Sequence, residues 1–318
     1  ILEDLTHPGK ALGKSGGKGY QIYSLVHDSV PDFFGSVSND YIIRTEDYGI
    51  PQARHRVILL GVRSDIAIKP DKLQRAVDNR VTETVISDCP PLRSGLSKGE
   101  DSPKEWQKQV SVAAEKAAEG LLQVGLDKSS ISLSTQKSSK LNSRGGRFLS
   151  RRRKFRGDQE IANWYLDKNL DGFVNHESRG HIVEDLARYF FCASYAQQSG
   201  GVSPRADAFP DSLAPNHANW KSGNFVDRFK VQAANKPSST ITSHISKDGH
   251  YFIHPDPSQC RSLTVREAAR LQTFPDNYFF EGTRTQQYVQ VGNAVPPYLA
   301  MQIAEVVNNL LEAHLEQI

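Results

Sequence analysis

The sequence predicts an α/β protein in which short strands and amphipathic helices alternate with long irregular segments. Short apolar patterns indicate strands at residues 18–26, 41–44 and 56–63. Apolar residues at helical spacing indicate two long helices, over 103–124 and 180–198. The stretches 69–99 and 127–146 are rich in proline, serine or glycine, which predicts connectors and flexible loops.

Helix ends are marked by capping signals. Ser102-Pro103-Lys104-Glu105 predicts a capping box with proline at the first helical position. The helix that follows would bury one face, which contains Trp106, Val110, Ala113, Ala117 and Leu121. Thr264-Val265-Arg266-Glu267 predicts a second capping box, and Pro275 bounds that helix at its far end. Pro297 begins a last helix whose apolar stripe predicts docking on a core.

Length and composition limit the class of protein. With 318 residues the chain can form one large domain or two modest ones with their own cores. No apolar run approaches the ~20 residues that a membrane span needs, which predicts an intracellular protein. Cys89, Cys192 and Cys260 are far apart and odd in number. This argues against a disulfide framework or a cysteine-based zinc site and favours small buried side chains.

The basic residues are unevenly distributed, although the formal net charge is only +3. The segment 140–156 has no acidic residue, and the chain outside it has 31 basic against 36 acidic side chains. One cationic segment on an otherwise acidic protein is typical of phosphate binding. A solvated basic loop fits the same composition. The eight basic residues are Lys140, Arg144, Arg147, Arg151, Arg152, Arg153, Lys154 and Arg156.

The stretch 46–63 combines a tight Gly-Pro turn, two arginines two residues apart, and an apolar run that predicts one buried strand. Along a strand, Gln52, Arg54 and Arg56 would project from the same side. Two guanidiniums on one face suit a bidentate acceptor such as a phosphate or a base edge. An edge strand with a solvated basic face remains an alternative interpretation.

Three blocks resemble DNA (cytosine-5)-methyltransferases, and they stand in that family's order. Residues 48–56 (Tyr-Gly-Ile-Pro-Gln-Ala-Arg-His-Arg) are similar to its Gln-x-Arg-x-Arg block. Residues 261–276 resemble the next block, and residues 290–297 (Gln-Val-Gly-Asn-Ala-Val-Pro-Pro) resemble the last. Residues 240–280 look most similar to bacterial Dcm-like enzymes. The resemblance covers nearly the whole chain and implies a cytoplasmic, nucleoid-associated bacterial protein of a restriction-modification system.

The resemblance implies roles for particular residues. Arg56 would hold O2 of a cytosine flipped out of the duplex, where negative charge develops during the reaction. Arg54 would hold other groups of the site or a phosphate, and Gln52 belongs to the same catalytic block. Gly292, Asn293 and Ala294 would close the pocket for the cofactor, S-adenosyl-L-methionine. Taken alone, Gly-Asn before Pro-Pro is also simply a turn before a helix.

The long segment between the blocks would recognise double-stranded DNA. The implied architecture is the last strands of a Rossmann-like methyltransferase sheet in 1–67, an irregular α+β target-recognition domain in 68–258, and a return segment with a C-terminal helix in 259–318. Phosphate or base contacts are expected from Arg144, Arg147, Arg151, Arg152, Arg153, Lys154, Arg156, Arg179, His244 and Lys247. Histidines 176, 181, 244, 250 and 254 lack the spacing of a metal site, so no metal is expected.

Residues 1–45 contain none of the family's earlier blocks, namely its Phe-x-Gly-x-Gly cofactor loop, its Pro-Cys nucleophile turn and its Glu-Asn-Val block. We therefore expect a C-terminal portion of such an enzyme, inactive alone, with only part of the cofactor site. Its partners would be double-stranded DNA and an N-terminal catalytic half on the same or a separate chain. The alternative is a non-catalytic DNA-binding module derived from such an enzyme.

Overall fold

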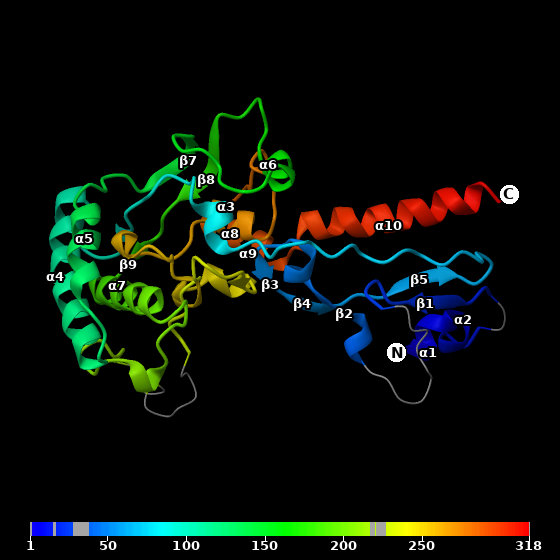
Figure 1. Cartoon of the computed structure of the whole chain (residues 1–318), viewed down its shortest axis with the longest axis horizontal. Helices are drawn as coiled ribbons and strands as arrows, with labels where there is room; N and C mark the ends of the chain where they lie inside the picture. Colours follow the sequence, from blue (N-terminus) through cyan, green and yellow to red (C-terminus); the bar gives the residue numbers. More distant parts are fainter. Residues whose placement is uncertain (1, 15–16, 28–37, 217–219, 221–226, 318) are drawn as a thin grey trace.

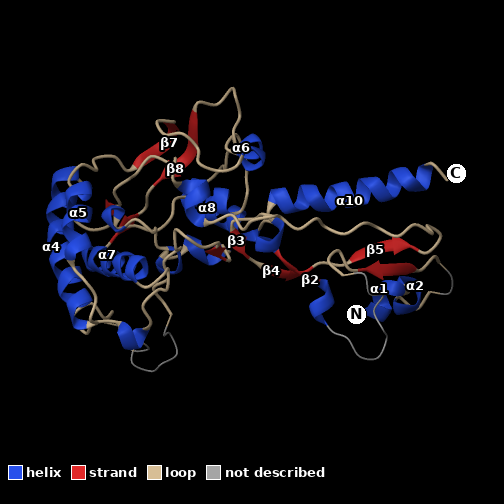
Figure 2. Cartoon of the chain, in the orientation of Figure 1, coloured by secondary structure: helices blue, strands red, loops and turns tan. Residues whose placement is uncertain are grey.

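The computed structural model describes residues 2–14, 17–27, 38–216, 220 and 227–317. It is an elongated molecule with a helical lobe at one end, a central part, and an arm at the other end (Figure 1). Among the described residues the strands form five two-stranded sheets rather than the larger Rossmann-like sheet that the resemblance implies (Figure 2). Helices and irregular segments supply most of the remaining structure.

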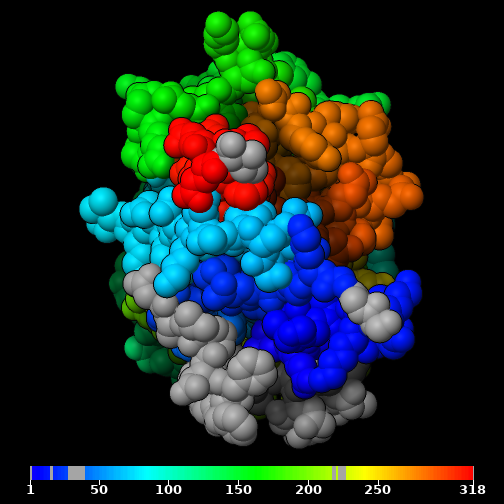
Figure 3. Space-filling model, turned by 90° about the vertical axis from the view of Figure 1, so that its right-hand side faces the viewer, coloured from blue at the N-terminus to red at the C-terminus, as the bar shows by residue number. Residues whose placement is uncertain are grey.

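The arm contains the first and last elements of the chain. Strand β1 pairs with β5 in antiparallel register, with Tyr20 opposite Arg63, and both strands lie within predicted strand segments, residues 18–26 and 56–63. Figure 3, viewed along the arm, shows the C-terminal helix lying on the segment that follows β5. The elements of the arm are α1 (Leu2–Thr6), α2 (Pro8–Ala11), β1 (Tyr20–Tyr23), β5 (Leu60–Arg63) and α10 (Pro297–Leu315).

The single buried strand expected after the Gly-Pro turn is instead three short strands. Strand β3 (Gln52–Ala53) pairs with β10 (Ser238–Ser239), and β4 (His55–Val57) pairs with β2 (Ile42–Arg44). The third, β5, pairs with β1. Each piece has a different partner, so no continuous ladder forms. Val57 of β4 is 55% exposed, so this piece is not the buried strand that the apolar run predicted.

The helical lobe packs α4 (Pro103–Gln123) against α7 (Val183–Gln198). Helix α4 has the predicted bounds within one residue, and the Ser102 side chain accepts the Glu105 N–H at 3.2 Å. All five predicted core residues of α4 are buried. The serine-rich stretch expected to be flexible instead contains α5 (Ser129–Ser138), whose Ile131 packs into the same core. Packing therefore outweighs the weak helix propensity of serine.

The central part contains the two later blocks. Thr264 and Glu267 form the predicted capping box at the start of α8 (Val265–Leu271). Helix α9 (Arg284–Asn293) follows and packs against α8. The other helices are α3 (Thr82–Ile86) and α6 (Gln159–Tyr165), and the other strands are β6 (Gly95–Leu96), β7 (Gly145–Ser150), β8 (Gly172–Glu177) and β9 (Gly180–His181). The 3₁₀ turns are η1 (Ser38–Tyr41), η2 (Thr45–Tyr48), η3 (Ala206–Ala208), η4 (Ser243–Ser246), η5 (His250–Phe252) and η6 (Pro257–Gln259).

Candidate functional site

The site is organised around residues 238–247, which we call the docked segment. Its first residues add a parallel strand to β3, with Ser238 opposite Gln52. The hydroxyl of Thr240 also donates to the carbonyl of Ala53 at 2.9 Å. These bonds join residues that are almost 190 positions apart in sequence, so the Gln-x-Arg-x-Arg block and the docked segment form one structural unit.

Gln52 is fully buried and uses its amide to connect three segments. Its Nε2 donates to the carbonyl of Leu271 at 3.1 Å and to Oε1 of Gln272 at 3.0 Å. Its Oε1 accepts the N–H of Ile241 at 2.9 Å. Gln272 in turn donates to the carbonyl of Val291 at 2.9 Å. All three sequence blocks therefore meet at the docked segment through buried amide groups.

Arg54 is directed to the same residue as Gln52. Its Nη1 donates to the carbonyl of Ile241 at 3.0 Å, and only 9% of the residue is exposed. Burial, together with the nearby charge of Arg56, lowers the pKa of Arg54. Gln52 and Arg54 thus both bind groups of the protein in this structure, and their expected catalytic role stays a prediction.

Arg56 differs from its two neighbours because it is exposed on β4, where it lies opposite Ile43 of β2. Its Nη1 donates to the carbonyl of His55 at 2.7 Å. Among the described residues, this is the one hydrogen bond that its guanidinium makes. Of the three candidates in this block, Arg56 is the exposed one.

Gly292 is in direct contact with the docked segment. A Cβ atom at this position would lie 2.2 Å from both the Ser243 nitrogen and the Thr242 carbonyl carbon. Only glycine permits such an approach between two backbones. The next residue, Asn293, ends α9 and is exposed, while Ala294 is half-buried. Helix α9 thus holds the docked segment on one side and presents the Asn293 amide on its surface.

Arg151, an expected DNA contact, is instead part of a mostly buried ion-pair network. It bridges Asp88 and Asp276, with 2.6 Å between its Nη2 and Asp276 Oδ2. Arg270 is fully buried and pairs with the same two carboxylates. Although burial opposes it, the charge of Arg270 lowers the pKa of Asp276. Arg151, the first residue after β7, therefore anchors the basic segment 140–156 to the core.

Two further expected DNA contacts are also engaged within the protein. Arg144 pairs with Asp101 at 2.7 Å and donates to the carbonyl of Ser178 at 3.0 Å. Arg179 is only 8% exposed and donates to two carbonyls of the docked segment. The sequence pattern could not separate these arginines from the exposed ones, because their carbonyl and carboxylate partners lie far away along the chain.

The other basic candidates are exposed, as DNA contacts would need to be. Arg147 lies over the ring of Phe279 at 5.2 Å, and Arg156 is 3.8 Å from Glu83. Within the docked segment, both His244 and Lys247 expose their side chains. The exposed basic residues of the 140–156 segment are Lys140, Arg147, Arg152, Arg153, Lys154 and Arg156.

Four of the histidines considered for a metal site are buried, namely His176, His181, His250 and His254. Burial lowers the pKa of His176 to about 4. Its Nδ1 lies 2.9 Å from the Thr264 hydroxyl and its Nε2 2.8 Å from the Pro90 carbonyl, so it joins two loops. Burial also lowers the pKa values of His181 and His250. Within the described part of the chain, no group of three His, Cys, Asp or Glu side chains is placed to share a metal ion.

All three cysteines are buried and free, and burial raises the pKa of each thiol well above its usual value. A thiolate is the nucleophilic form of cysteine, and these environments disfavour it. We therefore assign no nucleophilic role to Cys89, Cys192 or Cys260.

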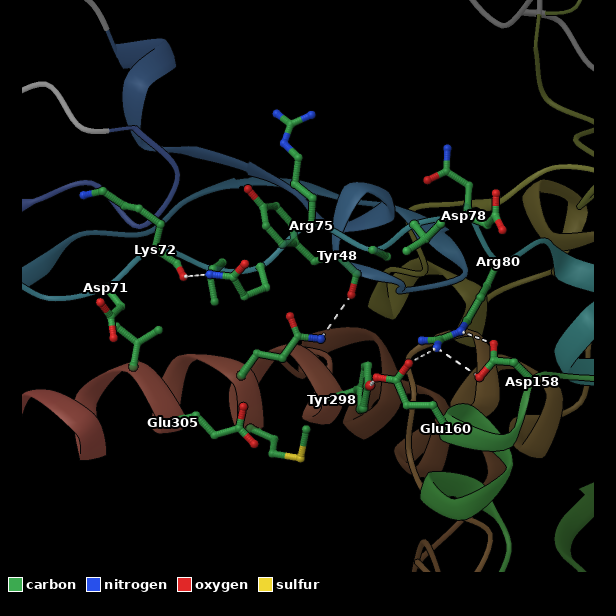
Figure 4. Close-up of a pocket in the computed structure, with 18 of the residues that line it drawn as sticks. Tyr48, Asp71, Lys72, Arg75, Asp78, Arg80, Asp158, Glu160, Tyr298 and Glu305 are labelled. Carbon is green, nitrogen blue, oxygen red and sulfur yellow. Dashed lines mark hydrogen bonds and ion pairs between the residues drawn. The ribbon is translucent and has the colours of Figure 1, made fainter.

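A cleft of about 730 Å³ lies between residues 71–80 and α10 (Figure 4). Arg80 lines it and donates to the Gly49 carbonyl at 2.9 Å, while its other nitrogens pair with Asp158 and Glu160. The Tyr298 hydroxyl donates to Glu160, and the Tyr298 ring lies 5.5 Å from the Arg80 guanidinium carbon. Sequence reasoning missed this cluster, which ties the Gly-Pro turn to α6 and α10.

Most of the sequence matches one protein family. Residues 37–309 match the model of the family described as C-5 cytosine-specific DNA methylase. This chain belongs to that family. The type II methyltransferase M.Bpa9945I of Bacillus paralicheniformis is 36% identical over 279 residues, which cover 86% of this chain and 51% of that protein. For M.DdeI of Desulfomicrobium norvegicum, the identity is 26%, and the alignment covers 88% of this chain and 57% of that protein.

The chain also resembles a solved structure, that of an Escherichia coli prophage protein described as a DNA modification methyltransferase. The TM-score is 0.53 at 16% identity, and the match covers 98% of this chain and 66% of that one. At this identity the likeness concerns the fold. The chain spans about half the length of the curated relatives it matches. Among its described residues, no helix is both long and apolar enough to cross a bilayer.

The family match corrects the expected function. The sequence was expected to be a C-terminal portion without the catalytic block, or else a non-catalytic module. The family match over residues 37–309, together with a relative aligned over 86% of the chain, contradicts this expectation. The inferred inactivity has no support in these findings, and nor does a separate N-terminal catalytic half as a partner. The membership of the cytosine-specific DNA methylase family and the similarity to type II methyltransferases are confirmed.

Proposed function

We propose that this methylase transfers a methyl group from S-adenosylmethionine to carbon 5 of cytosine in double-stranded DNA. One observation carries the proposal. Three blocks that resemble the family meet at Ile241 through buried amides, while Arg56 next to them remains exposed. The buried amides of Gln52 and Gln272 are neutral, so they hold the arginine strand in place without forming an ion pair with Arg56.

The chemistry proposed for Arg56 follows from where charge develops. Carbon 5 of cytosine is out of reach inside a duplex, so the base must be flipped out and held. In the chemistry that the resemblance implies, a cysteine thiolate adds to carbon 6, which places negative charge on the ring and partly on O2. Carbon 5 then takes the methyl group from the sulfonium of S-adenosylmethionine, and loss of the carbon-5 proton and of the thiolate restores the ring. A guanidinium fixed at O2 stabilises this charge more in the transition state than in the ground state. An exposed arginine on a short, paired strand supplies such a donor.

Residues at the end of α9 fit a cofactor pocket. The Asn293 amide is exposed and offers both a donor and an acceptor, and the Gly292 contact fixes its backbone against the docked segment. S-adenosylmethionine would supply the methyl group. Gly292 and Ala294 would provide close backbone approach, and Asn293 a hydrogen bond. The expectation that this chain supplies only part of the cofactor site has no support in the family match.

DNA would be held by the exposed cations and read by the docked segment. We assign phosphate contacts to Arg147, Arg152, Arg153, Lys154 and Arg156, since phosphates position DNA without specifying sequence. His244 and Lys247 present donors that could reach base edges. The target-recognition role of residues 68–258 stays a prediction.

The test measures 5-methylcytosine formed on duplex DNA by the protein that carries this chain, with labelled S-adenosylmethionine. Arg56→Ala should lower kcat by about 10²–10³ with little change in KM for DNA, since the donor matters mainly in the transition state. Arg56→Lys keeps the charge without the planar fork and should rescue activity only in part.

Arg44→Ala is the matched control, because Arg44 is an exposed arginine on β2, the strand that pairs with β4. Arg44→Ala should change kcat by no more than about twofold, far less than the 10²–10³ expected from losing one donor to the transition state. Absence of 5-methylcytosine with the parent protein contradicts the proposed function. Normal turnover by a folded Arg56→Ala variant contradicts the role of Arg56 alone.

A further inference from the structure

Arg179 occupies the turn between β8 and β9, yet its side chain extends to the far end of the docked segment. Its Nη2 donates to the Ile245 carbonyl at 2.6 Å and its Nη1 to the Lys247 carbonyl at 2.7 Å. These carbonyls lie at the C-terminal end of η4, where backbone dipoles concentrate partial negative charge. The guanidinium satisfies both with charge-assisted bonds.

The environment of Arg179 keeps it away from solvent. Its guanidinium carbon lies 4.5 Å above the centre of the Tyr288 ring, and Tyr288 is itself only 1% exposed. Among the described residues, no carboxylate forms an ion pair with Arg179. A buried charge without a counter-ion is costly unless several groups stabilise it. Here two carbonyls and an aromatic face do so, and all of them are fixed parts of the fold.

The docked segment is therefore held at both ends. At its start, Gln52 and Arg54 bind the N–H and the carbonyl of Ile241. At its end, Arg179 binds the carbonyls of Ile245 and Lys247. The side chain of Lys247 is exposed although its carbonyl is bound, and His244 is exposed between the two anchors.

Resting on the proposed function, we propose that Arg179 is a positioning residue that sets sequence discrimination. It does so by holding the backbone that carries His244 and Lys247. Base-edge contacts require donors at fixed positions, whereas phosphate contacts tolerate movement and carry no sequence information. Losing Arg179 frees the end of the segment, so the two donors no longer meet one base pair in one geometry. The affinity for unselected DNA, which depends on the exposed cations, stays the same.

The test selects bound duplexes from a random DNA pool and compares affinities for the selected and unselected sequences. Arg179→Lys retains a charge but cannot span both carbonyls, so it should lower the affinity ratio by roughly 5- to 150-fold, the range for losing one good base contact. Affinity for unselected DNA and its dependence on salt should match the parent. Backbone amides of residues 243–248 should exchange hydrogen faster in the variant, whereas those of α7 should not.

Arg188→Lys is the matched control. Arg188 is also a largely buried arginine in the same region, and it donates to the carbonyls of Leu213 at 2.8 Å and Ala214 at 3.4 Å, away from the docked segment. It should lose comparable stability yet keep the parent's discrimination. A parent-like ratio with Arg179→Lys would overturn the proposal.

Other outcomes are equally decisive. Weaker binding to all sequences with a flatter salt dependence would show that Arg179 contacts phosphate directly, and a parent that selects no sequence would also refute the inference. A parent that selects a sequence but forms no 5-methylcytosine on it would contradict the proposed function while the role of Arg179 stands.

Discussion

Gln52 is the residue whose loss should most clearly report the contact between the three family blocks. Replacing it with Leu keeps most of the side-chain volume but removes the amide. Three groups then lose their partner in the interior: the Ile241 N–H, the Leu271 carbonyl and Oε1 of Gln272. Each buried polar group left unpaired costs about 1–3 kcal/mol. We expect a loss of roughly 3–5 kcal/mol, since the Leu271 carbonyl is the least demanding of the three.

Such a loss is large compared with the total. Folded domains are stable by about 5–15 kcal/mol, so Gln52→Leu should remove at least about a fifth of the free energy of unfolding. Gln52→Glu should be no better at neutral pH, because a carboxylate can accept from Ile241 N–H but cannot donate to Leu271 or Gln272. Denaturant unfolding, with midpoint and slope both measured, gives the free energies directly.

Gln107→Leu is the matched control. The Gln107 Nε2 lies within hydrogen-bonding distance of three acceptors, the carbonyls of Ser139 and Leu141 and Asn142 Oδ1, which its two hydrogens share on the half-exposed side of α4. Water can replace these bonds, so the loss should stay below about 1 kcal/mol. If Gln52→Leu costs no more than Gln107→Leu, the buried amide connection does not stabilise the fold and our reasoning is refuted.

Two other changes test neighbouring features. Gly292→Ala should destabilise the protein by about 1–3 kcal/mol despite the better helix propensity of alanine, because the added Cβ would meet the Ser243 backbone at 2.2 Å. A thermal unfolding midpoint equal to or above the parent's would contradict this contact. Changing Arg152, Arg153 and Lys154 together to Ala should weaken binding to all duplexes alike. It should also reduce the slope of log K against log salt by up to about 3, since each lost phosphate contact contributes ~0.9. Binding titrations at several salt concentrations measure both quantities, and an unchanged slope would show that these cations are only solvated.

Much of the local structure could be predicted from the sequence. The bounds of α4, the capping box of α8 and the start of α10 at Pro297 agree with their capping signals. Strands β1 and β5 also lie within the predicted strand segments 18–26 and 56–63. These features depend on neighbouring residues, whose spacing along the chain is directly visible. The three blocks in order indicated the family correctly, and the match over residues 37–309 confirms it.

What the tertiary structure decided is which polar side chains are available. Arg151, Arg152 and Arg153 are identical and adjacent, yet the first is bound by Asp88 and Asp276 while the other two are exposed. Arg56 and Arg54 share one motif, but only Arg54 reaches the Ile241 carbonyl. The sequence by itself therefore determined the family, the helices and the set of candidate residues. Only the fold could divide that set, because long-range partners, rather than residue type or spacing, determine whether a guanidinium is used inside the protein or left free to bind DNA.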